Sequence, residues 1–211
     1  MTHDLNRRGA LAGLAALAGG GLLATPAFAA LSAADQALVT KATDYLQGLT
    51  SAKGRFVQYD PRGVSTGGSF YLQRPGKARF AYDAPSSKVL VSDGSIVAET
   101  DTRLKTVSRY PLGATPLALF LARNIRLDKS VRVVSVGRLN GGFSITVADG
   151  GGKARGQLTL NFSDSPVRLL GWVIRTAQGS TRVQLTSLER ASGLDPKLFV
   201  TPPAPRRTGR P

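Results

Sequence analysis

The sequence predicts a mostly β domain of the α+β class, in which a strongly curved antiparallel sheet forms an incomplete barrel. The first observation is a change of hydrophobic period, from the helical spacing of residues 33–50 to alternating apolar and polar residues from Arg55 onward. The second is a series of about eleven short alternating segments separated by Gly, Pro, Asp and Ser. The third is that only two segments have helical patterns. Because two helices cannot cover both faces of such a sheet, we expect them to close one mouth of a half-barrel.

The first 29 residues have the pattern of a secretory signal peptide. Arg7-Arg8 forms a basic start, residues 9–23 form an uncharged run rich in Ala, Gly and Leu, and Ala27-Phe28-Ala29 is a small-x-small cleavage pattern. The uncharged run is short for a membrane-spanning helix. We therefore expect a cleaved signal at residues 1–29 and a protein exported to the periplasm. The paired arginines leave two export routes open, the general secretory route and the twin-arginine route.

Residues 30–203 are long enough to form a single domain with its own hydrophobic core. The basic stretch at 204–211 lies beside several prolines, and we expect this tail to be disordered. The chain has no cysteine, which excludes disulfides, cysteine metal sites and thiol nucleophiles.

The predicted domain begins with an amphipathic helix at residues 33–50. Ser32 and Asp35 form the start of a capping box, and apolar residues follow at helical spacing. The alternating pattern then predicts six strands, at residues 55–60, 68–74, 78–83, 87–92, 95–100 and 104–109.

The segment ATPLALFLARN interrupts the alternation. Thr115 is a candidate N-cap and Pro116 the first helical residue of a short helix at 116–123 that is apolar nearly all round. Such a helix needs burial on more than one face, which either a lined cavity or a solid core would provide. Five more strands are predicted, at residues 131–139, 142–148, 155–163, 167–176 and 180–188. Asn140-Gly141 is a strong signal for a two-residue hairpin turn.

The chain is strongly basic, with a formal net charge of +15. This charge favours anionic lipid surfaces or acidic partners, and it equally fits a solvated surface rich in arginine. For an exported protein we expect no nucleic-acid partner, and we expect no stable membrane insertion.

The residue types exclude several kinds of catalytic site. The single histidine, His3, lies in the predicted signal, so the rest of the chain has neither His nor Cys. Ser-His-Asp catalysis, Cys-His catalysis and imidazole metal sites are therefore excluded. Most carboxylates lie in turn-like settings such as Asp93-Gly94. A carboxylate pair for glycoside hydrolysis and a Ser/Lys pair remain as alternatives without a local signature. We expect no enzymatic activity, no cofactor and no metal.

The remaining candidate site is a set of apolar side chains that strand alternation can direct to one concave side. An ordinary barrel core is the alternative for any one of them. On the fifth strand the pattern allows Ile96 or Val97. The predicted cavity lining is Leu46, Leu49, Phe56, Phe70, Leu72, Phe80, Tyr82, Val89, Val91, Ile96, Leu117, Phe120 and Leu121.

Five segments of the chain occur in the order in which one known family has them. They are YLQGLTSAKGRFVQY, GGSFYLQRPGKARFAYDAP, KVLVSDGSIV, TPLALFLARN and DPKLFVTPP. Each is weak alone, whereas five in the same order are specific. From Leu46 to Pro203 the chain resembles the periplasmic outer-membrane lipoprotein carriers, the LolA family.

The resemblance implies a half-barrel with a helical lid over a hydrophobic cavity that carries the acyl chains of lipoproteins. It implies transfer from an inner-membrane ABC transporter to an outer-membrane acceptor, and we expect a monomer. The family commonly has tryptophan after the Ser-Asp-Gly turn, where this chain has Val97, and the only tryptophan is Trp172. Two other functions stay open: binding or sensing of free lipids and other apolar ligands, and an exported carboxylate hydrolase.

Arg74 closes the apolar row of Phe70 and Leu72 on one predicted strand face. Arg74 matches the arginine of the family's Arg-Pro block. The resemblance implies that this arginine bonds to backbone around the helices and holds the lid closed. The residues themselves allow this role, because a buried guanidinium needs acceptors and the last carbonyls of a helix lack partners and favour a cation. The alternative is a rim arginine that reaches water.

Overall fold

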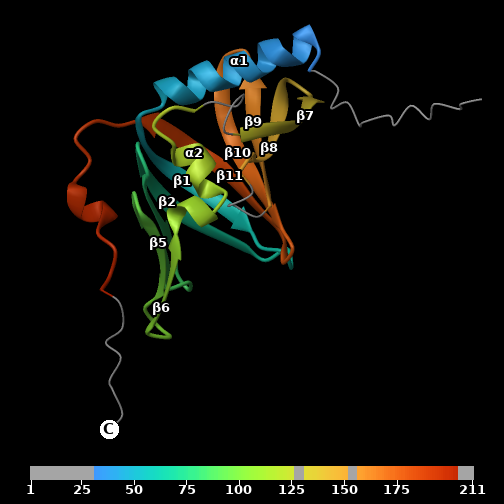
Figure 1. Cartoon of the computed structure of the whole chain (residues 1–211). Helices are drawn as coiled ribbons and strands as arrows, with labels where there is room; N and C mark the ends of the chain where they lie inside the picture. Colours follow the sequence, from blue (N-terminus) through green and yellow to red (C-terminus); the bar gives the residue numbers. More distant parts are fainter. Residues whose placement is uncertain (1–30, 126–130, 152–155, 204–211) are drawn as a thin grey trace, which may run out of the picture. The chain divides into compact units, whose positions relative to one another are not determined.

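Two antiparallel meanders build the domain, and pairing of the first strand with the last joins them into one eleven-stranded sheet (Figure 1). The computed structural model describes residues 31–125, 131–151 and 156–203. The predicted signal at 1–29 and the predicted tail at 204–211 lie outside the described residues. The elements are α1 (Ala33–Gly48), β1 (Ser51–Tyr59), β2 (Ser65–Gln73), β3 (Lys77–Tyr82), β4 (Lys88–Asp93), β5 (Ile96–Asp101), β6 (Thr106–Pro111), η1 (Leu112–Ala114), α2 (Leu117–Leu121), β7 (Val131–Leu139), β8 (Gly142–Asp149), β9 (Gln157–Asp164), β10 (Val167–Thr176), β11 (Gly179–Arg190) and η2 (Pro196–Phe199).

The sheet is open and curved, as the sequence predicts. Its strand order is β6-β5-β4-β3-β2-β1-β11-β10-β9-β8-β7, so β6 and β7 form the two edges of the described sheet. All neighbouring strands are antiparallel. Figure 1 shows α2 inside the curve of the sheet and α1 across one end of it. The class and the curvature are therefore confirmed, and the two helices lie where they can close the concave side.

Helix α1 starts at its predicted cap and covers one end of the sheet. The Ser32 hydroxyl accepts a hydrogen bond from the Asp35 backbone N–H at 3.1 Å, which satisfies one of the N–H groups left free at a helix start. The buried residues of the helix, Val39, Ala42 and Leu46, recur at three- and four-residue spacing and form one apolar stripe. This stripe joins the core, and α1 contacts β10 and β7.

Helix α2 is shorter than predicted, and its N-cap differs. The helix runs from Leu117 to Leu121 and Pro116 is its N-cap residue. Thr115 does not cap it, because a preceding turn of 3₁₀-helix uses that residue: the Thr115 hydroxyl donates to the Leu112 carbonyl at 2.8 Å.

Strand boundaries follow the hydrophobic alternation where it is regular. β7 and β10 have their predicted limits, and Asn140 and Gly141 form the predicted two-residue connection, with φ of 71° at Gly141. β1 begins four residues before its predicted start, at Ser51. The segment from Ser51 to Gly54 has little alternation, but it pairs with β2 and, from Ala52 onward, with β11. Pairing on two sides therefore makes it a strand.

The outer face of the sheet is also covered at one place. The turn η2 contacts β3 and β4, and Phe199 is buried there. The Arg79 guanidinium donates to the Leu198 carbonyl at 3.4 Å, and the Thr201 hydroxyl donates to the Asp93 carboxylate at 3.2 Å. β4 is therefore buried on both faces, which explains why its sequence, KVLVSD, is an apolar run rather than an alternation.

Gly68 of β2 lies beneath the aromatic ring of Phe56. A Cβ atom at this position would lie 2.6 Å from the ring and 2.5 Å from the Ala81 carbonyl oxygen. We expect Gly68→Ala to lower the free energy of unfolding by about 1–3 kcal/mol, because overpacking forces the ring and the strand to move. Urea unfolding followed by circular dichroism measures the change. Gly113→Ala is the matched control, since a Cβ atom added there would meet nothing within 4 Å; equal stability losses for the two variants would contradict the prediction.

Candidate functional site

A cavity of about 200 Å³ lies on the concave side of the sheet, beside the start of α2. Most of its lining is apolar or aromatic, and Gln58, Thr115 and Thr181 add polar groups. The lining residues are Gln58, Phe80, Tyr82, Leu90, Val97, Tyr110, Thr115, Pro116, Leu117, Trp172, Ile174, Thr181 and Val183.

Strand register brings this lining together from distant parts of the chain. Facing pairs are Phe80 with Leu90, Val97 with Tyr110, and Trp172 with Val183. Directly opposed residues share a face of the sheet, so each pair presents two side chains to the same side. Pairing of β1 with β11 then places the two halves of the lining side by side.

Aromatic rings form the boundary between the cavity and the packed core. The Trp172 ring stacks on Phe120 of α2, with centroids 5.7 Å apart and an interplanar angle of 29°. Its other neighbour is Phe80, whose ring meets it edge-on at 6.0 Å. Phe70 stacks on Phe80 at 6.2 Å. Trp172 therefore connects α2 to both halves of the sheet, and only 5% of its surface is exposed.

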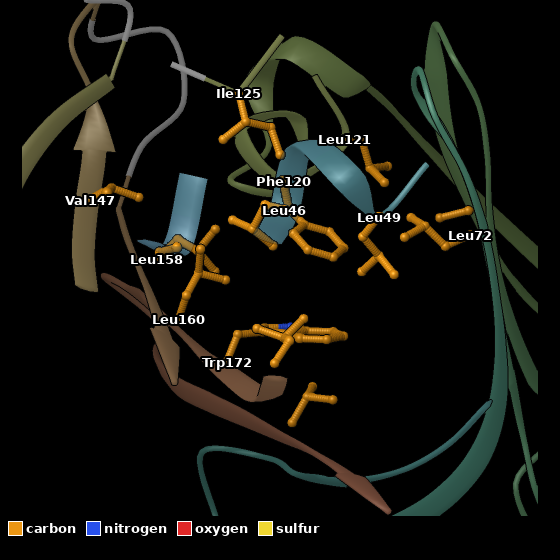
Figure 2. Close-up of a cluster of buried hydrophobic side chains, with 14 of the residues drawn as sticks. Leu46, Leu49, Leu72, Phe120, Leu121, Ile125, Val147, Leu158, Leu160 and Trp172 are labelled. Carbon is orange, nitrogen blue, oxygen red and sulfur yellow. The ribbon is translucent and has the colours of Figure 1, made fainter. Parts of the chain in front are cut away.

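Most of the predicted lining lies in a packed core rather than around the cavity. Phe80, Tyr82 and Leu117 line the cavity. Figure 2 shows side chains of α1, α2 and the strands packed together above Trp172. The predicted lining residues in the buried core cluster are Leu46, Leu49, Phe56, Phe70, Leu72, Phe120 and Leu121, together with Phe80, which also lines the cavity.

On β4 and β5 the structure corrects the prediction of which alternate residues point to the concave face. Leu90 and Val97 line the cavity, whereas the predicted residues Val89, Val91 and Ile96 do not. Successive residues of a strand point to opposite faces, so both neighbours of Leu90 point to the outer face. The sequence allowed Ile96 or Val97, and the structure selects Val97.

Sequence reasoning missed two central lining residues, Trp172 and Gln58. Trp172 follows Gly171, where the pairing of β10 with β9 shifts register, so its direction does not follow from simple alternation. Gln58 is polar and therefore falls outside an apolar pattern. The sequence feature that could have identified Gln58 is its position two residues after Phe56, which places both side chains on the same face of β1.

Arg74 reaches both helices from the end of β2. Its Nη1 donates to the Leu46 carbonyl in the last turn of α1, so the guanidinium contacts a helix C-terminus. The guanidinium carbon lies 5.3 Å from the centroid of the Phe120 ring of α2, in cation–π contact. Nε and Nη2 are buried without a hydrogen-bond partner among the described residues. Burial lowers the pKa of Arg74 to about 10, so the side chain stays charged at neutral pH.

Backbone and amide bonds hold the far end of α2. The Gly76 N–H donates to the Leu121 carbonyl at 2.8 Å, and the Gly76 carbonyl accepts from the Ser92 hydroxyl at 2.6 Å. Gln47 of α1 bonds the segment after α2 at two points: its Nε2 donates to the Arg123 carbonyl at 3.3 Å, and its Oε1 accepts from the Ile125 N–H at 3.1 Å. A few polar contacts therefore tie α2 to α1 and to the turn between β2 and β3.

Removing the Gln47 contacts tests how these bonds hold the helix. We expect Gln47→Met to speed hydrogen exchange of the Ile125 amide by roughly three- to tenfold, because a lost hydrogen bond is worth about 0.5–1.5 kcal/mol. Exchange measured by NMR gives the rate. Gln36→Met, an exposed position on the same helix, is the control. An unchanged Ile125 rate in Gln47→Met would show that the amide does not restrain this segment.

One polar pair stands inside the cavity. The Tyr82 hydroxyl donates to the Gln58 Oε1 at 2.7 Å. Burial, followed by the nearby negative charge of Glu99, raises the pKa of Tyr82 to about 12. The phenol therefore remains a protonated donor at neutral pH.

None of the residues that line the cavity is acidic or basic. Across the described residues, no cluster of three or more His, Asp or Glu side chains could hold a metal ion. No helix in the described ranges is both long enough and apolar enough to cross a membrane.

Comparison with known proteins identifies the family. The family model described as outer membrane lipoprotein carrier protein LolA matches residues 47–202. The outer-membrane lipoprotein carrier protein of Methylococcus capsulatus is 33% identical over 171 residues, covering 78% of this chain and 78% of that protein. The carrier protein of Cupriavidus pinatubonensis is 32% identical over 126 residues, covering 52% of this chain and 59% of that protein. The crystal structure of a LolA superfamily protein from Nitrosomonas europaea is similar with a TM-score of 0.47 and 9% identity, covering 82% of this chain and 99% of that one. The chain therefore belongs to the LolA family of outer membrane lipoprotein carrier proteins.

Proposed function

We propose that this protein carries the acyl chains of lipoproteins through the periplasm, from an inner-membrane ABC transporter to an outer-membrane acceptor. Family membership and the names of its relatives support this class of cargo. The observation that carries the proposal is the apolar cavity beside α2, with the helix held there by the contacts of Arg74 and Gly76. The protein acts as a monomer and without catalysing a reaction.

The free energy of burying acyl chains sets what the site must do. Each methylene group removed from water contributes about 0.8 kcal/mol, so a chain of a dozen or more methylenes needs near-complete cover. The cavity of about 200 Å³ is small beside the roughly 300–1,000 Å³ of typical ligand sites. To bind an acyl chain, α2 must therefore move away from the sheet, so that the volume it now occupies becomes part of the cavity.

The contacts of α2 suit such a movement. The helix has only five residues. It is held by the cation–π contact of Arg74 with Phe120, by the Gly76 bond to the Leu121 carbonyl, and by the two bonds of Gln47 to the segment that follows it. When α2 moves away, these contacts break, and they form again when it returns. Their formation therefore favours the closed state of the protein over the state that holds cargo. Only the open fraction of the protein binds, which reduces net affinity in proportion to the cost of opening and helps cargo leave.

The only tryptophan of the chain provides a direct test of the cavity. We expect dibromostearic acid to quench Trp172 emission in a saturable manner, because bromine quenches tryptophan on close contact, whereas stearic acid will not quench it. Stearic acid added to the brominated complex should restore the emission. Emission that is equal with both acids would overturn the proposal that acyl chains enter this cavity.

The identity of the cargo needs a second experiment. Native mass spectrometry of the protein isolated from the periplasm should show complexes whose added mass is that of acylated lipoproteins. Free lipids as the only bound species would instead support the alternative, a binding or sensing protein for free lipids.

A further inference from the structure

Gln58 is a polar residue on the apolar concave face. The preceding residue on the same face of β1 is Phe56, which is 1% exposed and belongs to the packed core. Gln58 lies opposite Val183 of β11 and is half-buried where this core gives way to the cavity. A ligand that covered this amide would remove water from its N–H groups, at a cost unless the ligand supplied an acceptor.

Tyr82 orients the Gln58 amide. Because the Tyr82 hydroxyl donates to Oε1 at 2.7 Å, the amide rotates so that Nε2 carries its two N–H donors away from Tyr82. Among the described residues no acceptor faces Nε2 in a hydrogen bond. In the described residues, the buried side-chain nitrogens that lack a partner are two nitrogens of Arg74, and Gln58 Nε2 is not among them. Nε2 is therefore accessible from outside the core. The donors are therefore available to a molecule in the cavity.

The chemistry of the donors defines the matching ligand. A hydrocarbon chain offers no acceptor, and filling the cavity with one would leave both N–H groups unpaired. An acyl chain ends in a carbonyl, whose oxygen accepts such bonds within the plane of the group. A site built to donate discriminates against an analogue that lacks the acceptor.

We propose that the Gln58 amide, oriented by Tyr82, donates to the carbonyl oxygen of ester- or amide-linked acyl groups and so selects acyl chains over plain alkyl chains. This inference rests on the proposed binding of acyl chains in the cavity. It adds a specificity determinant at the carbonyl end of the chain.

Matched ester and ether lipids test the inference. Dioctanoylglycerol and its diether analogue, dioctylglycerol, compete against dibromostearic acid, and recovery of Trp172 emission reports their affinities. We expect Gln58→Met to lower the ester-to-ether affinity ratio roughly three- to tenfold relative to wild type, as the loss of one or two hydrogen bonds predicts. Comparing ratios between proteins cancels the small difference in hydrophobicity between the lipids. Tyr82→Phe should lower the ratio by a smaller factor, because it frees the amide without removing it.

The control and the outcomes separate this inference from the proposed function. Gln184→Met makes the same substitution at an exposed position paired with Val57, the neighbour of Gln58, and should keep the wild-type ratio. Unchanged ether affinity in Gln58→Met shows that the cavity is folded. An unchanged ester-to-ether ratio in that variant overturns the role of Gln58 while leaving the carrier function intact. Failure of both lipids to displace the probe from wild type overturns the carrier function and this inference together.

Discussion

Replacing Arg74 by leucine will slow release of acyl cargo by roughly tenfold or more and leave its capture close to the wild-type rate. The guanidinium ties the closed helix α2 to α1, through its bond to the Leu46 carbonyl and its contact with the Phe120 ring. A hydrogen bond to a charged group is worth about 1.5–3 kcal/mol. Leucine removes that bond from the closed state and offers apolar surface to an acyl chain. Both changes favour the loaded state.

A two-step assay measures the effect. A fluorescent diacylated peptide is first captured from donor vesicles, and its transfer to acceptor vesicles is then followed separately. Arg190→Leu is the control, because Arg190 bonds the Gly48 carbonyl at the same end of α1 but is exposed. If Arg74→Leu and wild type release cargo at the same rate, Arg74 does not act as a latch.

The melting temperature of Arg74→Leu shows whether Arg74 acts as a latch or is needed for the stability of the fold. Two of its nitrogens are buried without a partner among the described residues, and burial is what lowers its pKa. Leucine removes these two unpartnered nitrogens from the interior, and the desolvation cost that this recovers offsets the lost bond to the Leu46 carbonyl. We therefore expect slower release without a lower melting temperature. A large loss of stability would mean that the transfer defect reflects unfolding.

Trp172→Ala will produce the largest loss of stability, about 3–5 kcal/mol in the free energy of unfolding. The ring is 5% exposed and packs on Phe120 and Phe80. Its removal enlarges the existing cavity toward Phe120 of α2. Since domains of this size are stable by about 5–15 kcal/mol, the variant should unfold at a markedly lower urea concentration. Circular dichroism follows the transition without the lost tryptophan signal.

The variant Trp172→Phe shows how much of the stability loss comes from losing an aromatic contact and how much from losing the larger indole ring. Phenylalanine retains an aromatic contact with Phe120 and should show less than half of the loss found for alanine. A loss below about 1 kcal/mol in Trp172→Ala would show that α2 collapses into the vacated space. That outcome would contradict our conclusion that the ring supports the helix over the cavity.

The candidate site could be predicted only in part, and β4 shows why. Period-two spacing establishes that Val89 and Val91 share one face and that Leu90 lies on the other. It cannot say which face is concave, because η2 covers the outer face of β4 and makes both faces apolar. The predicted residues Val89 and Val91 therefore lie on the face opposite to Leu90, whereas Phe80 and Tyr82 on β3 line the cavity.

The division between lining and core depends on α2. Its sequence requires burial on several sides, which both a cavity plug and a solid core satisfy. In the fold its C-terminal half, with Phe120 and Leu121, is core, whereas Leu117 at its start lines the cavity. Only the tertiary position of a five-residue helix determines this division.

By itself the sequence determined the class of the fold, the strand boundaries where alternation is regular, the cap of α1 and the contact of Arg74 with a helix end. These features depend on local chemistry, namely side-chain period, capping oxygens and the need of a buried cation for acceptors. The tertiary structure decided which face of each strand is concave, and it brought Trp172 and Gln58 to the cavity. Those results depend on the pairing of β1 with β11 and on η2 and α2, which are separated along the chain and meet only in the folded sheet.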